Sequence, residues 1–147
     1  MHAPPTADTL RLDVEALNAF LLRAFPDSPQ DHRGLVVEAR PGWVRATIHP
    51  GSTQFRPGGL VSGPTLMGLA DMAAYALVLA HVGEVAMAVT NALSIHFLRG
   101  CRPGRVTADA SLLRLGRRTV TSDVRIWSDD ADRLVAHATV AYTLPSI

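Results

Sequence analysis

Over four stretches in the second half of the chain, apolar residues alternate with polar ones, so that every second side chain is apolar. This period of two is typical of β-strands with one buried face. The stretches are residues 93–97, 106–112, 120–127 and 134–143, separated by turns at 102–104, 115–117 and 129–132. The pattern predicts a meander of antiparallel strands joined by short turns.

The first fifty residues carry two other patterns. Residues 14–25 place apolar side chains at three- and four-residue spacing, with Asp13 before them and Pro26 after them. This predicts a short amphipathic helix with Asp13 as its N-cap. The runs 35–39 and 43–48 flank a Pro-Gly turn and predict a β-hairpin.

A glycine-rich loop and a strongly apolar helix connect the hairpin to the meander. Residues 51–63 contain four glycines and one proline and predict a loop that ends at Ser62, a suitable N-cap. Residues 64–81 are apolar on nearly every side, so we expect a helix that is buried all round. One such helix between a hairpin and a meander predicts an α+β fold, with one sheet curled around one helix.

Length and composition limit the organisation of the protein. With 147 residues we expect one domain over residues 1–147, with a helical extension over about the first 30. Hydrophobic residues make up 48%, charged residues 18%, and the net charge is +1. This balance argues against nucleic acid and membrane surfaces as partners and favours a small molecule or a protein. It also suggests that apolar surface is buried between subunits.

The single cysteine, Cys101, excludes an intrachain disulfide and a zinc site built from several thiolates. The N-terminus has no basic region followed by an apolar stretch, and the longest apolar run, 66–80, is shorter than a bilayer requires. We therefore expect a cytoplasmic protein. The histidines lack metal-ligand spacing, so we expect structural roles for them and no metal site.

Asp71 is the residue that most needs an explanation. It is the only formally charged residue between Arg56 and Glu84, and it lies within the apolar helix. A buried carboxylate without partners is costly, so Asp71 is either a hydrogen-bonded structural residue or a general base or nucleophile. Gly63, eight residues earlier, stands where a helix N-terminus presents unused N–H groups suited to an oxyanion. A glycine there is by itself a weak signal.

The segment Phe55–Asp71 resembles the loop–helix motif of hot-dog acyl-CoA thioesterases of the phenylacetate-degradation (PaaI) type. Residues 88–99, 115–118 and 134–139 are similar to strand patterns of the same family. The resemblance extends over about residues 35–144. It implies the hot-dog fold, in which an antiparallel sheet wraps around one long helix.

The resemblance also implies roles for individual residues. Asp71 matches the catalytic carboxylate, as base or nucleophile, and Gly63 matches the glycine whose N–H polarises the thioester carbonyl. Thr90 falls where some members have an active-site hydroxyl. In the family these groups come from two subunits, which implies a homodimer that often pairs into a homotetramer.

Two positions depart from the family motif. Ser62 stands where the family has histidine, and it can cap the helix but cannot act as a base. Arg56 stands where the family has an asparagine or glutamine that orients water. Arg56 could pair with Asp71 or bind a substrate carboxylate, and Gln54 could replace the missing amide.

The expected activity is hydrolysis of a small aromatic or short- to medium-chain acyl-CoA to the free acid and CoA, without a separate cofactor. The CoA phosphates require cations, for which Arg117 and Arg118 are the first candidates. The alternatives are a non-catalytic acyl-CoA-binding protein and a hot-dog dehydratase or hydratase. The dehydratases of this fold need a histidine near the carboxylate, and residues 51–71 contain none.

Overall fold

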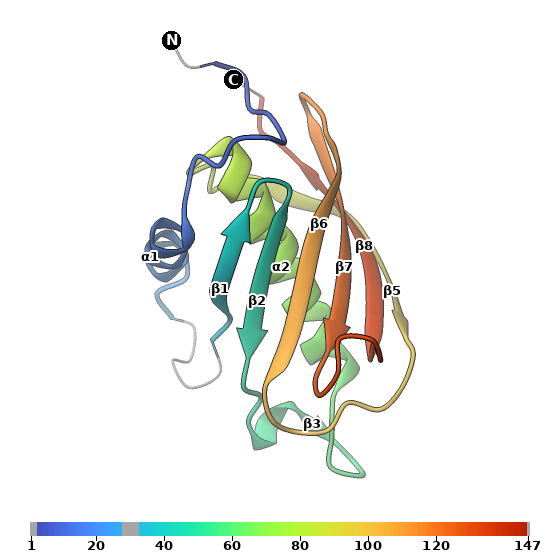
Figure 1. Ribbon diagram of the computed structural model, residues 1–147. Coiled ribbons are helices and arrows are strands. Elements are labelled where there is room, and N and C mark those ends of the chain that lie inside the picture. Colours follow the sequence, from blue (N-terminus) through green and yellow to red (C-terminus); the bar gives the residue numbers. More distant parts are fainter. Residues whose placement is uncertain (1–2, 28–32, 147) are drawn as a thin grey trace.

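The computed structural model describes residues 3–27 and 33–146 (Figure 1). Its elements are α1 (Val14–Ala24), β1 (Leu35–Arg40), β2 (Trp43–Ile48), a short 3-10 helix η2 (Ser52–Gln54), β3 (Phe55–Arg56), β4 (Leu60–Val61), α2 (Gly63–Val82), β5 (Val89–Phe97), β6 (Val106–Leu115), β7 (Thr119–Trp127) and β8 (Ala136–Thr143). The predicted helices and the β1–β2 hairpin are confirmed, and each stretch of alternating residues is a strand. The predicted meander of four strands was wrong for its first strand, because β5 does not pair with β6 but lies at the far edge of the sheet beside β8, so that only β6, β7 and β8 form a meander. Two expectations were wrong in detail, because the predicted loop holds η2 and the β3–β4 hairpin, and β8 begins at Ala136.

One antiparallel sheet with strand order β1-β2-β6-β7-β8-β5 forms the body of the molecule. Figure 1 shows α2 lying along one side of this sheet, with α1 beside the edge strand β1. Strand β5 is the other edge, and it pairs only with β8 in this chain. The sheet therefore ends on one side in a strand supported by α1 and on the other in a strand with an open edge.

Alanines allow α2 to approach the sheet closely. Fully buried alanines stand on both facing surfaces, and short side chains let the backbones pack at small separation. They include Ala70, Ala73, Ala76 and Ala80 on α2, and Ala46, Ala108 and Ala138 on the sheet. By length and apolar composition α2 could cross a membrane, but 72% of its most apolar window is buried inside the domain. It is the central core helix.

The expectation that α2 is buried all round was wrong for its first half. Met67 and Gly68 are exposed, and Asp71 and Met72 are only partly buried. Hydropathy alone cannot reveal this, since it reports that a helix is apolar and not which neighbours cover it. The uncovered face of α2 is where the candidate site lies.

His81 ties the C-terminal end of α2 to the β1–β2 turn. Its ring is fully buried, Nε2 accepts a hydrogen bond from the Gly42 N–H at 2.9 Å, and Nδ1 lies 2.9 Å from the Leu77 carbonyl oxygen. Because the Gly42 N–H can only donate, Nε2 must be the acceptor and Nδ1 carries the proton. His81 thus has the structural role expected of it.

Replacing His81 with phenylalanine should keep most of the volume and leave the Gly42 N–H without an acceptor. We expect the free energy of unfolding to fall by about 1–3 kcal/mol, the cost of an unsatisfied buried donor. Urea denaturation at fixed protein concentration measures it, with Asp132→Phe on the exposed β7–β8 turn as the control. Equal stability of the two variants would contradict this role.

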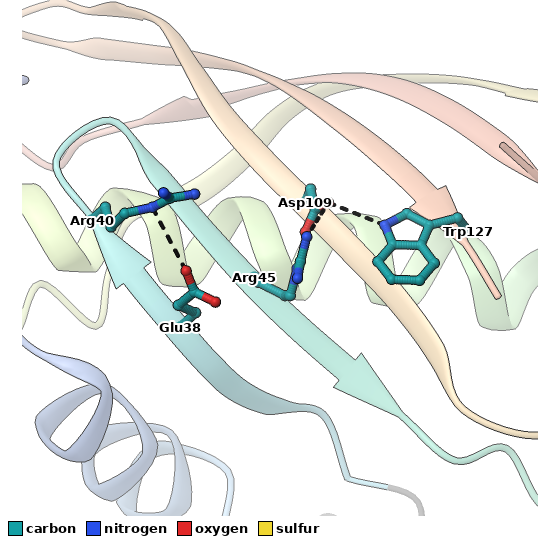
Figure 2. Close-up of polar contacts among 5 residues, drawn as sticks. All are labelled: Glu38, Arg40, Arg45, Asp109 and Trp127. Carbon is teal, nitrogen blue, oxygen red and sulfur yellow. Dashed lines mark hydrogen bonds and ion pairs between the residues drawn. The ribbon is translucent and has the colours of Figure 1, made fainter. Parts of the chain in front are cut away.

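The face of the sheet opposite α2 is polar, and Figure 2 shows a cluster of hydrogen-bonded and ion-paired side chains on it. Asp109 accepts hydrogen bonds from Arg45 Nε at 2.7 Å, Arg45 Nη2 at 3.1 Å and Trp127 Nε1 at 3.1 Å. Arg45 and Asp109 are directly opposite each other on β2 and β6, and Trp127 lies diagonally across from Asp109 on β7, so the cluster links these three strands. The Glu38–Arg40 ion pair beside it, at 3.7 Å, is exposed and adds little. Asp109 is a structural acid.

Candidate active site

A cavity of about 860 Å³ opens on the uncovered face of α2. Side chains from α1, α2, the loop after β2, the start of β5 and the end of β8 surround it. The lining residues are Leu21, Phe25, Arg33, Gly34, Ile48, Thr53, Gln54, Pro64, Thr65, Gly68, Leu69, Asp71, Met72, Tyr75, Ala86, Ala88, Val89, Thr90 and Tyr142. Asp71 is the one carboxylate among these described residues, so the site centres on the acid that the sequence singled out.

Two hydroxyl groups hold the Asp71 carboxylate. Thr90 Oγ1 donates to Asp71 Oδ1 at 2.7 Å, and the Tyr142 hydroxyl donates to the same oxygen, also at 2.7 Å. Tyr142 also lies 3.2 Å from the Asp71 carbonyl oxygen. Within the described chain no side chain donates to Oδ2. The carboxylate is therefore fixed in one orientation, with one oxygen occupied and the other available to a substrate or water.

Sequence reasoning found Asp71 and Thr90 but missed Tyr142. The inward positions of β8 are Ala136, Ala138, Val140 and Tyr142, and all are buried. Tyr142 is the only polar side chain among them. A buried tyrosine needs a partner for its hydroxyl, and this was the available signal. The identity of the partner depends on the fold.

Burial, more than any other cause, raises the pKa of Tyr142, and the nearby Asp71 carboxylate raises it further, although the hydrogen bond with Thr90 opposes the shift. Burial also raises the pKa of Tyr75. Both phenols therefore stay protonated in the folded protein to a higher pH than a free tyrosine does. Tyr142 remains a hydrogen-bond donor to Asp71 throughout the working pH range.

The two raised pKa values predict an alkaline limit to stability. Tyr75 and Tyr142 are the only tyrosines in the chain, and in the unfolded chain they ionise near pH 10. Because the folded protein holds both phenols in the neutral form, their ionisation does not affect the free energy of unfolding below that pH. The free energy of unfolding falls as the pH rises above it. We expect phenolate absorbance of the native protein to appear only above about pH 10, together with unfolding. Reversible titration near pH 10 without unfolding would contradict the environment described for these phenols.

The loop before α2 is held by short-range hydrogen bonds. Ser62 caps the helix as expected, since its Oγ accepts from the Thr65 N–H at 3.4 Å and lies 2.7 Å from Thr65 Oγ1. Gln54 Oε1 accepts from the Gly51 N–H at 2.9 Å, and the Gln54 carbonyl accepts from the Ser62 N–H. Gln54 lines the cavity and its Nε2 donates to no described group. An amide donor is therefore present near the site.

Gly63 is the first residue of α2, and its N–H is one of the helix donors that has no partner within the helix. A Cβ at this position would lie 3.4 Å from the Phe97 ring, so the glycine packs beside the end of β5. Gly63 precedes Asp71 by eight residues, which is about 12 Å along a helix axis. Within one chain, this N–H and the Asp71 carboxylate are too far apart to act on the same carbonyl group.

The predicted arginines lie outside the cavity lining. Arg56 is exposed, its Nε contacts the Pro57 carbonyl oxygen at 3.4 Å, and within this chain no ion pair with Asp71 is formed in the described structure. Arg117 and Arg118 occupy the β6–β7 turn, and Arg118 Nη2 donates to Ser146 Oγ at 2.7 Å. The next residue, Thr119 of β7, is paired with Thr143 of β8, and Thr143 is paired in turn with Val89 of β5. Thr119 is therefore two strand spacings, or about 10 Å, from β5. These two arginines are thus at the same end of the sheet as Thr90.

Other reactive groups lie elsewhere. Burial raises the pKa of the Cys101 thiol, which is not among the cavity-lining residues. No histidine lines the cavity, and residues 3–27 and 33–146 hold no group of three metal-ligating side chains. The chemistry available at this site is that of a carboxylate with neighbouring hydroxyl and amide groups and the guanidinium group of Arg33.

Comparisons with known proteins agree with this geometry. Residues 58–136 match the sequence profile of the thioesterase superfamily. Among solved structures, a candidate thioesterase from a Silicibacter species is 33% identical, with 99% of this chain and 100% of that chain covered and a TM-score of 0.85. A thioesterase from Pseudomonas aeruginosa, solved as a point mutant, is 26% identical over 96% of this chain and 100% of its own, with a TM-score of 0.80.

The phenylacetic acid degradation protein PaaI from Thermus thermophilus, also solved as a mutant, is 26% identical over 76% of this chain and 93% of its own, with a TM-score of 0.66. A comparison with curated proteins finds no match. The fold and the site define a hot-dog thioester hydrolase. The chain belongs to the thioesterase superfamily and is of the PaaI-like type.

Proposed function

We propose that this protein hydrolyses an acyl-CoA thioester with a small aromatic or short- to medium-chain acyl group, using Asp71 as the catalytic carboxylate. The observation that carries the proposal is the environment of Asp71. Its Oδ1 is held by Thr90 and Tyr142 at 2.7 Å each, Oδ2 has no donor from the described residues, and Asp71 lines the cavity. Fixed orientation of a reacting group is a main source of catalysis.

In the proposed reaction, Asp71 Oδ2 takes a proton from water as the water oxygen attacks the thioester carbonyl carbon. The carbonyl oxygen becomes an oxyanion that the Gly63 N–H of a second subunit stabilises. Collapse breaks the carbon–sulfur bond, and the proton returns to the CoA sulfur. The same free oxygen serves if Asp71 attacks the carbonyl carbon directly. In both routes Gln54 Nε2, which has no acceptor among the described groups, is the candidate to orient the water.

The proposal requires two subunits, and the open edge of β5 supports this. An open edge strand nine residues long is a template for pairing with another chain. If two copies pair their β5 strands antiparallel about Leu93, the midpoint of Val89–Phe97, then Phe97 of one copy faces the start of β5 in the other. Gly63 packs beside Phe97, and Thr90 bonds to Asp71. This pairing brings the two distant groups together in a homodimer, and dimers of this kind could assemble further into a homotetramer.

The test is to incubate the purified protein with benzoyl-, acetyl-, hexanoyl- and dodecanoyl-CoA and to follow thiol release. Turnover of at least one ester supports the proposal. Calorimetry with the same esters runs in parallel. Binding without turnover by the wild type would refute the enzyme and favour an acyl-CoA-binding protein. Absence of both binding and turnover would refute CoA esters as ligands.

A further inference from the structure

The cavity has two chemically different ends on either side of Asp71. Thr53, Gln54 and Thr65 supply hydroxyl and amide groups at one end. The other end is formed mainly by apolar and aromatic side chains, which are Leu21, Phe25, Met72, Tyr75, Ala86 and Ala88. Arg33 also lines the cavity, and its neighbour Gly34 packs against Met72 at the border of this end. An acyl chain prefers the apolar end, whereas the polar pantetheine arm of CoA prefers the polar end and solvent.

Three aromatic rings lead from the carboxylate to the surface at the apolar end. The Tyr142 hydroxyl donates to Asp71, and the Tyr142 and Tyr75 rings lie 5.7 Å apart between centroids. Phe25 meets Tyr75 edge to face, with 6.0 Å between centroids and 79° between ring planes. Tyr75 is buried, while Phe25 is 51% exposed, so Phe25 stands between the cavity and solvent. Among the described residues it is the outermost side chain of this wall.

Phe25 comes from the N-terminal segment, which the structure attaches firmly to the core. The Asn18 amide makes two hydrogen bonds with the backbone of Val36 on edge strand β1, at 2.8 and 2.9 Å. Earlier in the segment, the Arg11 N–H donates to the Ala80 carbonyl at 2.7 Å. Leu21, one helical turn before Phe25, is buried and also lines the cavity. Helix α1 is therefore held in one position relative to α2, and so is the ring of Phe25.

From this arrangement we infer that Phe25, positioned by the Asn18 clamp on β1, is the distal wall of the acyl pocket and sets the maximum length of the acyl group. The inference rests on the proposed thioesterase function and adds its specificity. The substrate class is an acyl group that ends against the Phe25–Tyr75 pair, such as a single aromatic ring or a medium straight chain. Longer chains collide with Phe25 and are excluded.

Variants at Phe25 test the wall directly. The measured quantity is the ratio of kcat/KM for dodecanoyl-CoA to kcat/KM for hexanoyl-CoA. Phe25→Ala removes the wall and should raise this ratio at least about tenfold, and Phe25→Trp should lower it, since a few atoms of mismatch in an apolar pocket change discrimination by that order. Leu22→Ala is the matched control, because Leu22 is on the same helix, is 48% exposed and does not line the cavity.

A second variant tests whether the position of the Phe25 ring matters as well as its presence. Asn18→Ala releases α1 from β1 and should raise the same ratio without any change in Phe25, while Leu22→Ala leaves the ratio as in the wild type. Ratios that stay at the wild-type value in all Phe25 and Asn18 variants would overturn the inference and leave the thioesterase function intact. Failure of the wild type to hydrolyse any of the CoA esters would instead refute the proposed function, and this inference with it.

Discussion

Replacing Asp71 with asparagine is expected to lower kcat by about 100-fold to 10,000-fold, the range in which a general base contributes. The substitution keeps the shape of the side chain, and its amide oxygen can still accept hydrogen bonds from Thr90 and Tyr142. What is lost is the carboxylate oxygen Oδ2, which must take a proton or attack the carbonyl carbon. KM should change much less than kcat, because the residue acts on the reacting atoms.

The matched control for this variant is Asp132→Asn, on the exposed β7–β8 turn, which removes a carboxylate far along the chain from the cavity lining. Steady-state kinetics on the best substrate of the CoA ester panel gives both constants. Thermal unfolding of both variants checks that the fold is retained. If Asp71→Asn turned over as fast as Asp132→Asn, Asp71 would be a structural acid, the first of the two interpretations that the sequence allowed.

The second large effect is expected from mixing two inactive variants. Gly63→Pro removes the N–H that would bind the oxyanion, and proline is tolerated at the first position of a helix. Loss of one such donor lowers kcat by about 100-fold to 1,000-fold. A dimer of one Asp71→Asn chain and one Gly63→Pro chain carries one doubly damaged site and one intact site. After equal mixing and subunit exchange, activity should rise to about one quarter of wild type, since half of the dimers are mixed.

Gly63→Ala is the control for this experiment, because alanine keeps the N–H and its Cβ meets the Phe97 ring at an ordinary 3.4 Å. It should lose far less activity than Gly63→Pro. Activity of the mixture that never exceeds the sum of its two components would mean that each site is built within one chain. The proposed pairing of β5 strands would then be wrong.

Much of the fold could be predicted from local patterns of hydrophobic, polar and capping residues. Alternation along the meander predicted its strands, and the capping roles of Asp13 and Ser62 followed from their places before helical runs. The loop before α2 was less predictable, because a hairpin of two-residue strands leaves almost no periodicity. Full burial of α2 was overestimated for a related reason, since an apolar helix face and a pocket wall have the same composition.

Of the candidate site, too, one part could be predicted from the sequence and another part could not. Asp71 stood out by its charge within an apolar helix, and Gly63 and Thr90 followed from the resemblance. Tyr142 could not be assigned to Asp71 from the sequence, because 71 residues separate them. The pairing of β7 with β8 and the packing of α2 on the sheet decide that contact.

The sequence by itself determined the elements, the class of fold through its resemblance, and the acid at which the candidate site is centred, because these follow from spacing over a few neighbouring residues. Only the tertiary structure decided that Asp71 is held through a single oxygen and that Phe25 lines the same cavity. Those contacts join residues from opposite parts of the chain. Strand register and helix packing bring them together, and local pattern carries no information about either.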